Sequence, residues 1–132
     1  MRKIEHLGFA VENIEEAIKT FEVLLNTSCY KIEEVVSEHV KTAFFQIGES
    51  KIELLEATDP SSAIAKYIAK KGKGIHHIAF DVEDINAEIK RLSENGFELI
   101  HQTPKDGADN KLIAFLHPKS TEGILIELCQ DK

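Results

Sequence analysis

A chain of 132 residues is long enough for one compact domain, or for two half-sized modules that share a core. Its 42% hydrophobic and 30% charged residues are ordinary for a globular protein, and no apolar stretch approaches the roughly 20 residues that span a bilayer. The net charge of −7 argues against binding to a nucleic-acid backbone, because no basic stripe is present to displace counterions. We therefore expect a globular protein without nucleic-acid or membrane partners.

The N-terminus enters a strand pattern at once, which leaves no room for a secretory signal and favours a cytoplasmic location. The two cysteines, Cys29 and Cys129, are far apart and lack a C-x-x-C spacing. In a reducing cytoplasm both are expected to be free thiols, with Cys129 buried near the end of a strand.

The first predicted element is a strand in which Leu7, Phe9 and Val11 alternate with His6, Gly8 and Ala10. A helix follows, because Asn13 is a suitable N-cap with a glutamate three residues later. Its apolar residues recur at helical spacing and form one stripe: Ile14, Ala17, Ile18, Phe21, Leu24 and Leu25. Three strands are expected next, near residues 29–36, 40–47 and 51–56.

A short linking helix is expected after the first three-strand run, opened by Asp59-Pro60 and stopped by Gly72. The pattern then starts again with a strand from His77 and a helix that Asp84 caps and Asn95-Gly96 ends. Three further strands are predicted near residues 98–102, 111–117 and 123–129. The sequence thus predicts a first module (1–58), a linking helix (59–73) and a second module (74–132) within one domain.

The two modules are a duplication. Residues 6–21 (HLGFAVENIEEAIKTF) and 77–92 (HIAFDVEDINAEIKRL) are identical at seven of sixteen positions, at an offset of 71 residues. The same offset relates Ala43-Phe44-Phe45 to Ala114-Phe115-Leu116, and Ile52-Glu53-Leu54 matches Ile126-Glu127-Leu128 after a slightly longer loop. The expected fold is α+β: two tandem βαβββ modules whose curved sheets enclose a shared site.

Strand alternation directs four polar side chains into that site. If Leu7 and Phe9 cover the helix, His6 points to the opposite, concave face, and the repeat gives His77 the same direction. Glu53 and Glu127 share that face because their isoleucine and leucine neighbours are core-facing. Alone, a strand histidine or glutamate is more often a surface or hydrogen-bonded residue, but the recurrence of both in both modules favours a shared site.

Two facing carboxylates repel each other unless a cation lies between them. We therefore predict a divalent metal held by His6, Glu53, His77 and Glu127. Two imidazoles and two carboxylates suit Co²⁺, Ni²⁺, Zn²⁺, Mn²⁺ or Fe²⁺, and the pattern does not choose among them. An octahedral ion would keep two positions for water or substrate oxygens.

These residues resemble the vicinal oxygen chelate (glyoxalase-like) superfamily and, within it, the methylmalonyl-CoA epimerase family, over nearly the whole chain. The similar stretches are HLGFAV at 6–11, KIELLE at 51–56, GIHHIAF at 74–80 and GILIEL at 123–128. The run AFLHPKST at 114–121 is the most specific of them, because the other patterns occur throughout the superfamily.

The resemblance implies an isomerase that inverts C2 of methylmalonyl-CoA through a metal-chelated enolate. It assigns the metal to the same four residues that the repeat selected, and it makes Glu127 one of the two proton carriers. Some members of the family have a glutamate where this chain has Thr42, so Glu53 or a water is expected to take the second role. His76, next to His77, is expected to face the other way and to be structural.

Several residues are candidate substrate contacts. Lys119 and Ser120, on the turn before the last strand, could bind the substrate carboxylate or the CoA phosphates, and Thr42 lies near the reacting atoms by register. A solvated turn is the alternative for the first two. The lysines around Gly72 could attract phosphates or form a wet surface, and the sequence does not decide between these: Lys70, Lys71 and Lys73.

Three other functions are alternatives. A glyoxalase I-type lactoylglutathione lyase needs the same metal ligands, and only the HPKS run favours CoA over glutathione. An Fe²⁺ dioxygenase typically has two histidines and one carboxylate, so a fourth ligand at Glu53 argues against it. A non-catalytic binding relative typically lacks the ligands. A homodimer is expected by analogy with the fold, with apolar surface offered by Phe44, Phe45 and Phe115.

Overall fold

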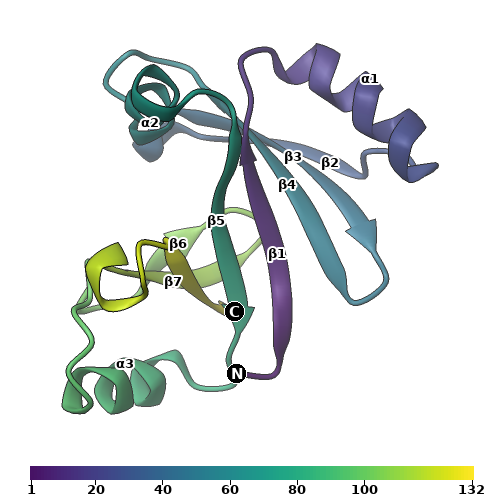
Figure 1. Cartoon of the computed structure of the whole chain (residues 1–132). Helices are drawn as coiled ribbons and strands as arrows, with labels where there is room; N and C mark the ends of the chain where they lie inside the picture. Colours follow the sequence, from purple (N-terminus) through teal and green to yellow (C-terminus); the bar gives the residue numbers. More distant parts are fainter. The chain divides into compact units, whose positions relative to one another are not determined.

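The computed structural model describes residues 1–132 and confirms an α+β fold in which a βαβββ pattern occurs twice (Figure 1). No helix is both long and apolar enough to cross a membrane. The first occurrence consists of β1 (Lys3–Ala10), α1 (Ile14–Leu25), β2 (Lys31–Val35), β3 (Val40–Ile47) and β4 (Ser50–Ala57), with a single turn η1 (Val36–Glu38) before β3. After α2 (Ala63–Lys71), the second consists of β5 (Gly74–Asp81), α3 (Ile85–Glu94), β6 (Lys105–Gly107), β7 (Lys111–Leu116), the turn η2 (Pro118–Ser120) and β8 (Ile126–Asp131).

The chain divides into two compact units. The first-half unit is Leu7–His76, and the second-half unit combines Met1–His6 with His77–Lys132. The division falls inside β1 and inside β5. The two histidines that the repeat aligns therefore belong to the same unit.

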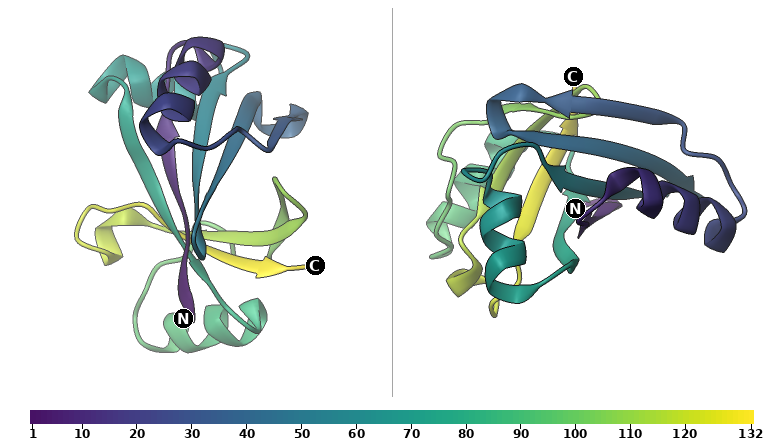
Figure 2. Two further views of the ribbon diagram at one scale, coloured as in Figure 1. Left: turned by 90° about the vertical axis from the view of Figure 1, so that its right-hand side faces the viewer. Right: turned by 90° about the horizontal axis from the view of Figure 1, so that it is seen from above.

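In the first-half unit, β2, β3 and β4 are antiparallel, and β3 and the middle of β4 are buried on both faces. One face packs against α1 through a cluster that includes Ile14, Phe45 and Leu54, and α1 lies along that side of the strands in both views of Figure 2. The other face carries a second cluster around Ala10 and Ile64, so Ala10 lies in packed core. Phe44 is 2% exposed and Phe45 is 0% exposed, because β3 is covered on both sides. The prediction that they offer dimer surface is therefore wrong.

Helix α1 begins as the sequence predicts and its predicted apolar stripe is confirmed in part. The Asn13 side chain accepts a hydrogen bond from the backbone N–H of Glu16, and Asn26 ends the helix in the left-handed region at φ 52°. Leu25 packs in the cluster under the helix, whereas Leu24 is 68% exposed. Adjacent helical residues are about 100° apart, which places Leu24 at the edge of the stripe.

In the second-half unit, β5 pairs parallel with β8, and β8, β7 and β6 follow as antiparallel neighbours. Asp84 caps α3 by accepting from the N–H of Ala87. The helix buries one face against β7 and β8 in a single hydrophobic cluster: Val82, Ile85, Ile89, Leu92, Leu99, Ala114, Leu116 and Leu128. Cys129 in β8 is fully buried, as the sequence predicts.

The strand predicted near residues 98–102 is wrong. Only Leu99 forms an isolated bridge, to Leu116, and the first regular strand after α3 is β6. Pro104 has no N–H to donate and disfavours the helical region for the residue before it, so pairing with β7 resumes only after it. The linking helix also begins later than predicted, at Ala63 with Ser62 as its N-cap, while Asp59 forms a turn with Ser61.

Candidate metal site

Three buried donor side chains converge within the second-half unit. His6 comes from β1, His77 from β5 and Glu127 from β8, and each residue is at most 5% exposed. The Nε2 atoms of the two histidines are 2.9 Å apart. Glu127 places Oε1 3.4 Å from Nε2 of His77 and Oε2 3.7 Å from Nε2 of His6.

The parallel register of β5 and β8 explains this convergence. Ala79 pairs with Glu127, and His77 lies two residues before Ala79, so all three side chains share one face of the sheet. Phe115 pairs with Glu127 on the other side, and its ring packs edge-on against His77 with centroids 5.6 Å apart. The small Ala79 side chain thus leaves room for the donor side chains, and the Phe115 ring packs beside them.

The spacing of the three donors fits a metal ion. Donor atoms bound at about 2.1 Å to one ion lie roughly 3 to 4 Å from one another. The observed separations of 2.9, 3.4 and 3.7 Å fall in that range. Two imidazoles and one carboxylate are ligands that suit the first-row divalent ions. His6, His77 and Glu127 are therefore chemically and geometrically suited to hold one.

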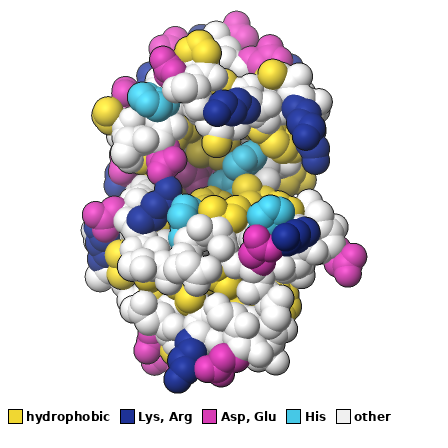
Figure 3. All heavy atoms as spheres, turned by 90° about the vertical axis from the view of Figure 1, so that its left-hand side faces the viewer, with side chains coloured by type: hydrophobic (Ala, Val, Ile, Leu, Met, Phe, Trp, Pro, Cys, Tyr) yellow, Lys and Arg dark blue, Asp and Glu magenta, His cyan; other side chains and the backbone are white.

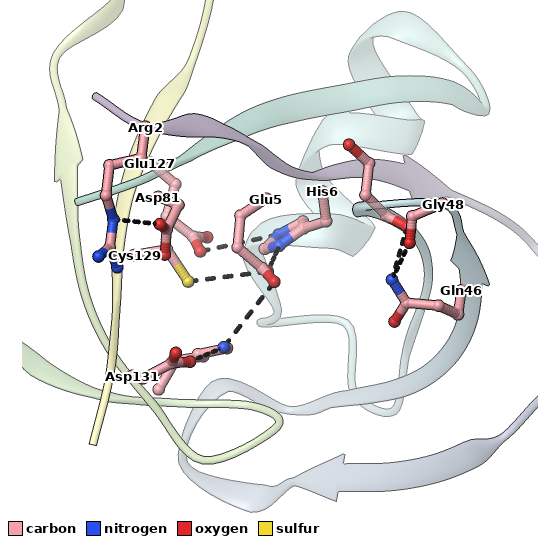
Figure 4. A network of polar contacts seen from close by, with 11 residues as sticks. Arg2, Glu5, His6, Gln46, Gly48, Asp81, Glu127, Cys129 and Asp131 are labelled. Atoms are coloured by element: carbon pink, nitrogen blue, oxygen red, sulfur yellow. Dashed lines mark hydrogen bonds and ion pairs between the residues drawn. The ribbon is translucent and has the colours of Figure 1, made fainter. Parts of the chain in front are cut away.

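Glu5 is a site residue that sequence reasoning missed. Its carboxylate is 3% exposed and lies 2.8 Å, through Oε1, from Nδ1 of His6. The same oxygen is 3.9 Å from the Cys129 sulfur, and Oε2 is 3.8 Å from Nζ of Lys111. Figure 4 shows the Glu5 carboxylate between the Cys129 sulfur and the His6 ring. Strand alternation alone gives no signal for this contact, because neighbouring side chains start on opposite faces.

Glu53 and His76 belong to the first-half unit. Glu53 is 5% exposed in β4, and its register partner in β3 is Phe44. The His76 ring packs edge-on against Tyr67 of α2 with centroids 4.8 Å apart, in keeping with the structural role expected for it. Burial lowers the pKa of His76, against an opposing effect of the Glu53 charge.

The predicted substrate contacts have partners in their own units. The Thr42 hydroxyl donates to the carbonyl of Glu33 at 2.8 Å. On the η2 turn, Lys119 forms an ion pair with Glu98 at 2.6 Å, and the Ser120 hydroxyl accepts from the N–H of Glu98 at 2.9 Å. The Lys119 hydrogen bond lowers the pKa of Glu98. Both turn residues are thus ordered by one glutamate.

Basic side chains do not form a single patch on the face that Figure 3 shows, where they are interspersed with acidic ones. The three lysines around Gly72 are all exposed: Lys70, Lys71 and Lys73. Their exposure agrees with a solvated surface and leaves a phosphate role as an expectation only.

Comparison with known proteins decides the family. Residues 5–115 match the model of the Glyoxalase/Bleomycin resistance protein/Dioxygenase superfamily. The chain belongs to this superfamily. Membership accounts for the repeated βαβββ pattern, and members of the superfamily bind divalent metals.

Three similar proteins narrow the position of the chain within the superfamily. A hypothetical protein from Bacillus halodurans has a solved structure that is 44% identical, with a TM-score of 0.96 over 98% of this chain and 94% of that one. An ethylmalonyl-CoA/methylmalonyl-CoA epimerase from Cereibacter sphaeroides is 35% identical over 97% of both chains. The structure of a Streptomyces coelicolor methylmalonyl-CoA epimerase variant, in complex with 2-nitronate-propionyl-CoA, is 30% identical, with a TM-score of 0.95 and coverage of 99% and 95%.

Proposed function

We propose that this chain is a metal-dependent epimerase that inverts C2 of methylmalonyl-CoA. The observation that carries the proposal is the buried set of His6, His77 and Glu127, which lies at metal-binding distances in a chain similar to a named epimerase over 97% of its length. An epimerase of this kind belongs to the isomerases.

The proton at C2 is weakly acidic, so the reaction needs stabilisation of the charge that develops when it leaves. A bound divalent ion supplies a Lewis acid for the substrate oxygens. Glu127 has two carboxylate oxygens that face the two histidines, and we assign it the transfer of a proton at C2. Inversion requires a second proton carrier on the opposite face of that carbon.

Glu53 is our candidate both for a fourth ligand and for the second proton carrier. It is buried, and it aligns with Glu127 in the repeat. Thr42 is not a base near neutral pH and its hydroxyl is occupied by the Glu33 carbonyl, so it contributes shape or a polar contact. Lys119 and Ser120 remain the proposed contacts for the substrate carboxylate or the CoA phosphates.

The test is proton exchange in deuterated water. Protein loaded with Co²⁺ is incubated with a single epimer of methylmalonyl-CoA, and ¹H NMR follows loss of the C2 proton while a coupled mutase assay follows inversion. We expect both signals from the wild type. We expect a loss of about 100-fold or more from Glu127→Gln, in the range typical of a proton carrier. His39→Asn, an exposed histidine outside the site, is the matched control and should behave as wild type.

A glyoxalase I-type lyase is the competing assignment, because the same ligands serve it. The methylglyoxal–glutathione hemithioacetal is therefore tested in parallel with the same Co²⁺-loaded protein. Turnover of the hemithioacetal without exchange at C2 of methylmalonyl-CoA would overturn the proposal. Activity on neither substrate, with no Co²⁺ bound, would favour a non-catalytic binding relative.

A further inference from the structure

A buried cluster of polar side chains lies behind His6, on the side of its ring away from His77. Nδ1 of His6 is 2.8 Å from Oε1 of Glu5, while Nε2 of the same ring is 2.9 Å from Nε2 of His77. The Glu5 residue is 3% exposed and His6 is 5% exposed. The two ring nitrogens of His6 therefore have different partners, and one partner is an anion-forming group.

This arrangement selects one form of the His6 ring. An ionised carboxylate can only accept hydrogen bonds, so with Glu5 ionised Nδ1 carries the proton that points at Glu5. In the neutral ring the Nε2 lone pair then points toward His77 and Glu127. A metal-ligating histidine typically has its other nitrogen bound to a carboxylate or carbonyl in this way, which fixes the ring orientation.

Two further groups hold Glu5 in place. Lys111 of β7 has Nζ 3.8 Å from Oε2 of Glu5, and it also forms an ion pair with Asp131. The Cys129 thiol of β8 lies 3.9 Å from Oε1 and is fully buried. The Glu5 carboxylate is thus contacted by a cation and a weak donor besides His6, which offsets the cost of burying it.

The duplication shows that this contact belongs to one module only. The offset of 71 residues aligns Glu5 with His76, which packs against Tyr67. The ligand histidines are equivalent in the repeat, but the residues that precede them differ in chemistry. The duplication therefore does not account for a buried glutamate at position 5.

We propose that Glu5 is a positioning residue for the metal site: it accepts the Nδ1 proton of His6 and aims Nε2 at the point shared by His6, His77 and Glu127. Lys111 and Cys129 keep the carboxylate in position. This inference rests on the proposed metal-dependent function, and it concerns metal affinity rather than the chemical step.

The first experiment is a titration with Co²⁺ alone, followed by its visible absorption bands. Glu5→Gln keeps the size of the side chain and removes the charge, and we expect it to bind Co²⁺ about 10- to 100-fold more weakly than wild type, as outer partners of ligating histidines do. Glu5→Asp keeps the charge on a shorter side chain and should recover part of the affinity. Urea unfolding of each metal-free variant measures stability separately.

Asp81→Asn is the matched control. Asp81 is a carboxylate of the same unit that is also buried, at 5% exposure against 3% for Glu5, but its partner is Arg2 at 2.7 Å. We expect this control to lose stability and to keep its Co²⁺ affinity. The inference is overturned if Glu5→Gln binds Co²⁺ as tightly as wild type, or if Asp81→Asn loses affinity equally. If the wild type itself binds no Co²⁺, the proposed function fails instead.

A second measurement uses the wild-type chain and does not depend on the variants folding. Two-dimensional ¹H–¹⁵N NMR of the imidazole nitrogens, on metal-free protein at about pH 8 where an ordinary histidine is neutral, reports which nitrogen is protonated. We expect His6 to carry its proton on Nδ1. A proton on Nε2 would show that Glu5 does not select the ligating form, whatever the metal titration gives.

Discussion

His6 and His77 present two imidazole nitrogens to each other at hydrogen-bond distance, among other buried polar side chains. Two neutral rings can satisfy this contact only if one donates and the other accepts. In the arrangement that we propose, Glu5 accepts the Nδ1 proton of His6, which leaves Nε2 of His6 as the acceptor. A divalent ion would replace the proton between the two rings, so that His77 carries its own proton on Nδ1 and both Nε2 lone pairs bind the ion together with an oxygen of Glu127.

We predict that His77→Ala weakens Co²⁺ binding by more than the loss expected for Glu5→Gln, hence by at least about 100-fold. The physical reason is that one of three converging donors is removed, whereas Glu5 acts only through another residue. Isothermal titration calorimetry with Co²⁺ measures the change. His39→Asn is the control, because asparagine tolerates the left-handed backbone of residue 39 at φ 53°. Equal affinities for the two variants would contradict the assigned ligand.

Lys119 lowers the pKa of Glu98 by donating a hydrogen bond to it, and this gives a test with a definite sign. A folded-state pKa below the unfolded one contributes stability above the ordinary pKa, and that contribution is lost as the pH falls through the folded value. In Lys119→Met the pKa of Glu98 should rise toward its usual range, as NMR titration would show. An unchanged pKa would mean that the ion pair does not persist in solution.

If Lys119 also binds substrate, its ammonium group must leave Glu98 to contact the anionic substrate, and a variant without this group should have an altered KM. We predict that Lys119→Met raises KM for methylmalonyl-CoA severalfold, because one cation is lost, with a smaller effect on kcat. Glu98→Gln is the control, since it removes the competing anion and should not raise KM. A KM raised equally by both variants would indicate that the turn needs the ion pair only for its own order.

The sequence predicted that His6, His77 and Glu127 share one face, because the duplication and strand alternation each give a direction to an individual side chain, and the structure brings these three together. It missed Glu5 for the same reason. The Glu5 side chain starts on the opposite face of the strand from His6 but is long enough to contact the His6 ring. The alternation of side chains along a strand does not predict such a contact. The Cys129 and Lys111 contacts of Glu5 come from strands more than a hundred residues away along the chain, which only the folded register brings near.

At the scale of elements, the helices were predicted better than the strands that follow them. Asn13 and Asp84 give α1 and α3 their first turns, and these caps are local chemistry that a sequence displays directly. The strand expected at residues 98–102 depends on a neighbour in β7, and Pro104 interrupts that pairing. Both faces of β3 are covered, so two adjacent phenylalanines that suggested a surface are core instead.

The buried and exposed faces of the helices predict that alanine substitutions at two positions of similar side-chain size change the free energy of unfolding by different amounts. Ile85 in α3 is fully buried in its cluster, and Ile85→Ala should destabilise the protein by about 2 to 5 kcal/mol because it leaves a cavity. Leu24 on α1 is 68% exposed, and Leu24→Ala should change stability by no more than about 0.5 kcal/mol. Urea unfolding measures both. A large loss from Leu24→Ala would reveal that an unseen partner covers this face.

At the scale of the whole molecule, the duplication and the compact units divide the chain differently. The repeat runs from residue 6 and from residue 77, whereas one compact unit takes Met1–His6 together with His77–Lys132. The N-terminal end of the first repeat thus folds with the second. The sequence shows the repeat clearly. It does not show which compact unit each end of β1 and β5 joins, because that depends on packing between the two repeats.

Metal binding should stabilise the folded chain as a whole, because the ligands come from both ends of the sequence. Binding to the native state adds about 2.7 kcal/mol when free metal is at 100 times its Kd. We therefore predict that EDTA lowers the Tm of metal-loaded protein by several degrees, and that excess Co²⁺ restores it. Differential scanning calorimetry with His77→Ala alongside is the check, since this variant should show no response to either addition.

The most direct test of a metal held by the paired histidines is anomalous diffraction from crystals of the Co²⁺-loaded protein. We predict a single strong peak within about 2.0 to 2.3 Å of Nε2 of His6, Nε2 of His77 and a carboxylate oxygen of Glu127, with Glu53 as the fourth protein ligand. A peak that contacts neither histidine, or fully loaded protein whose peak lies elsewhere on the surface, would contradict it.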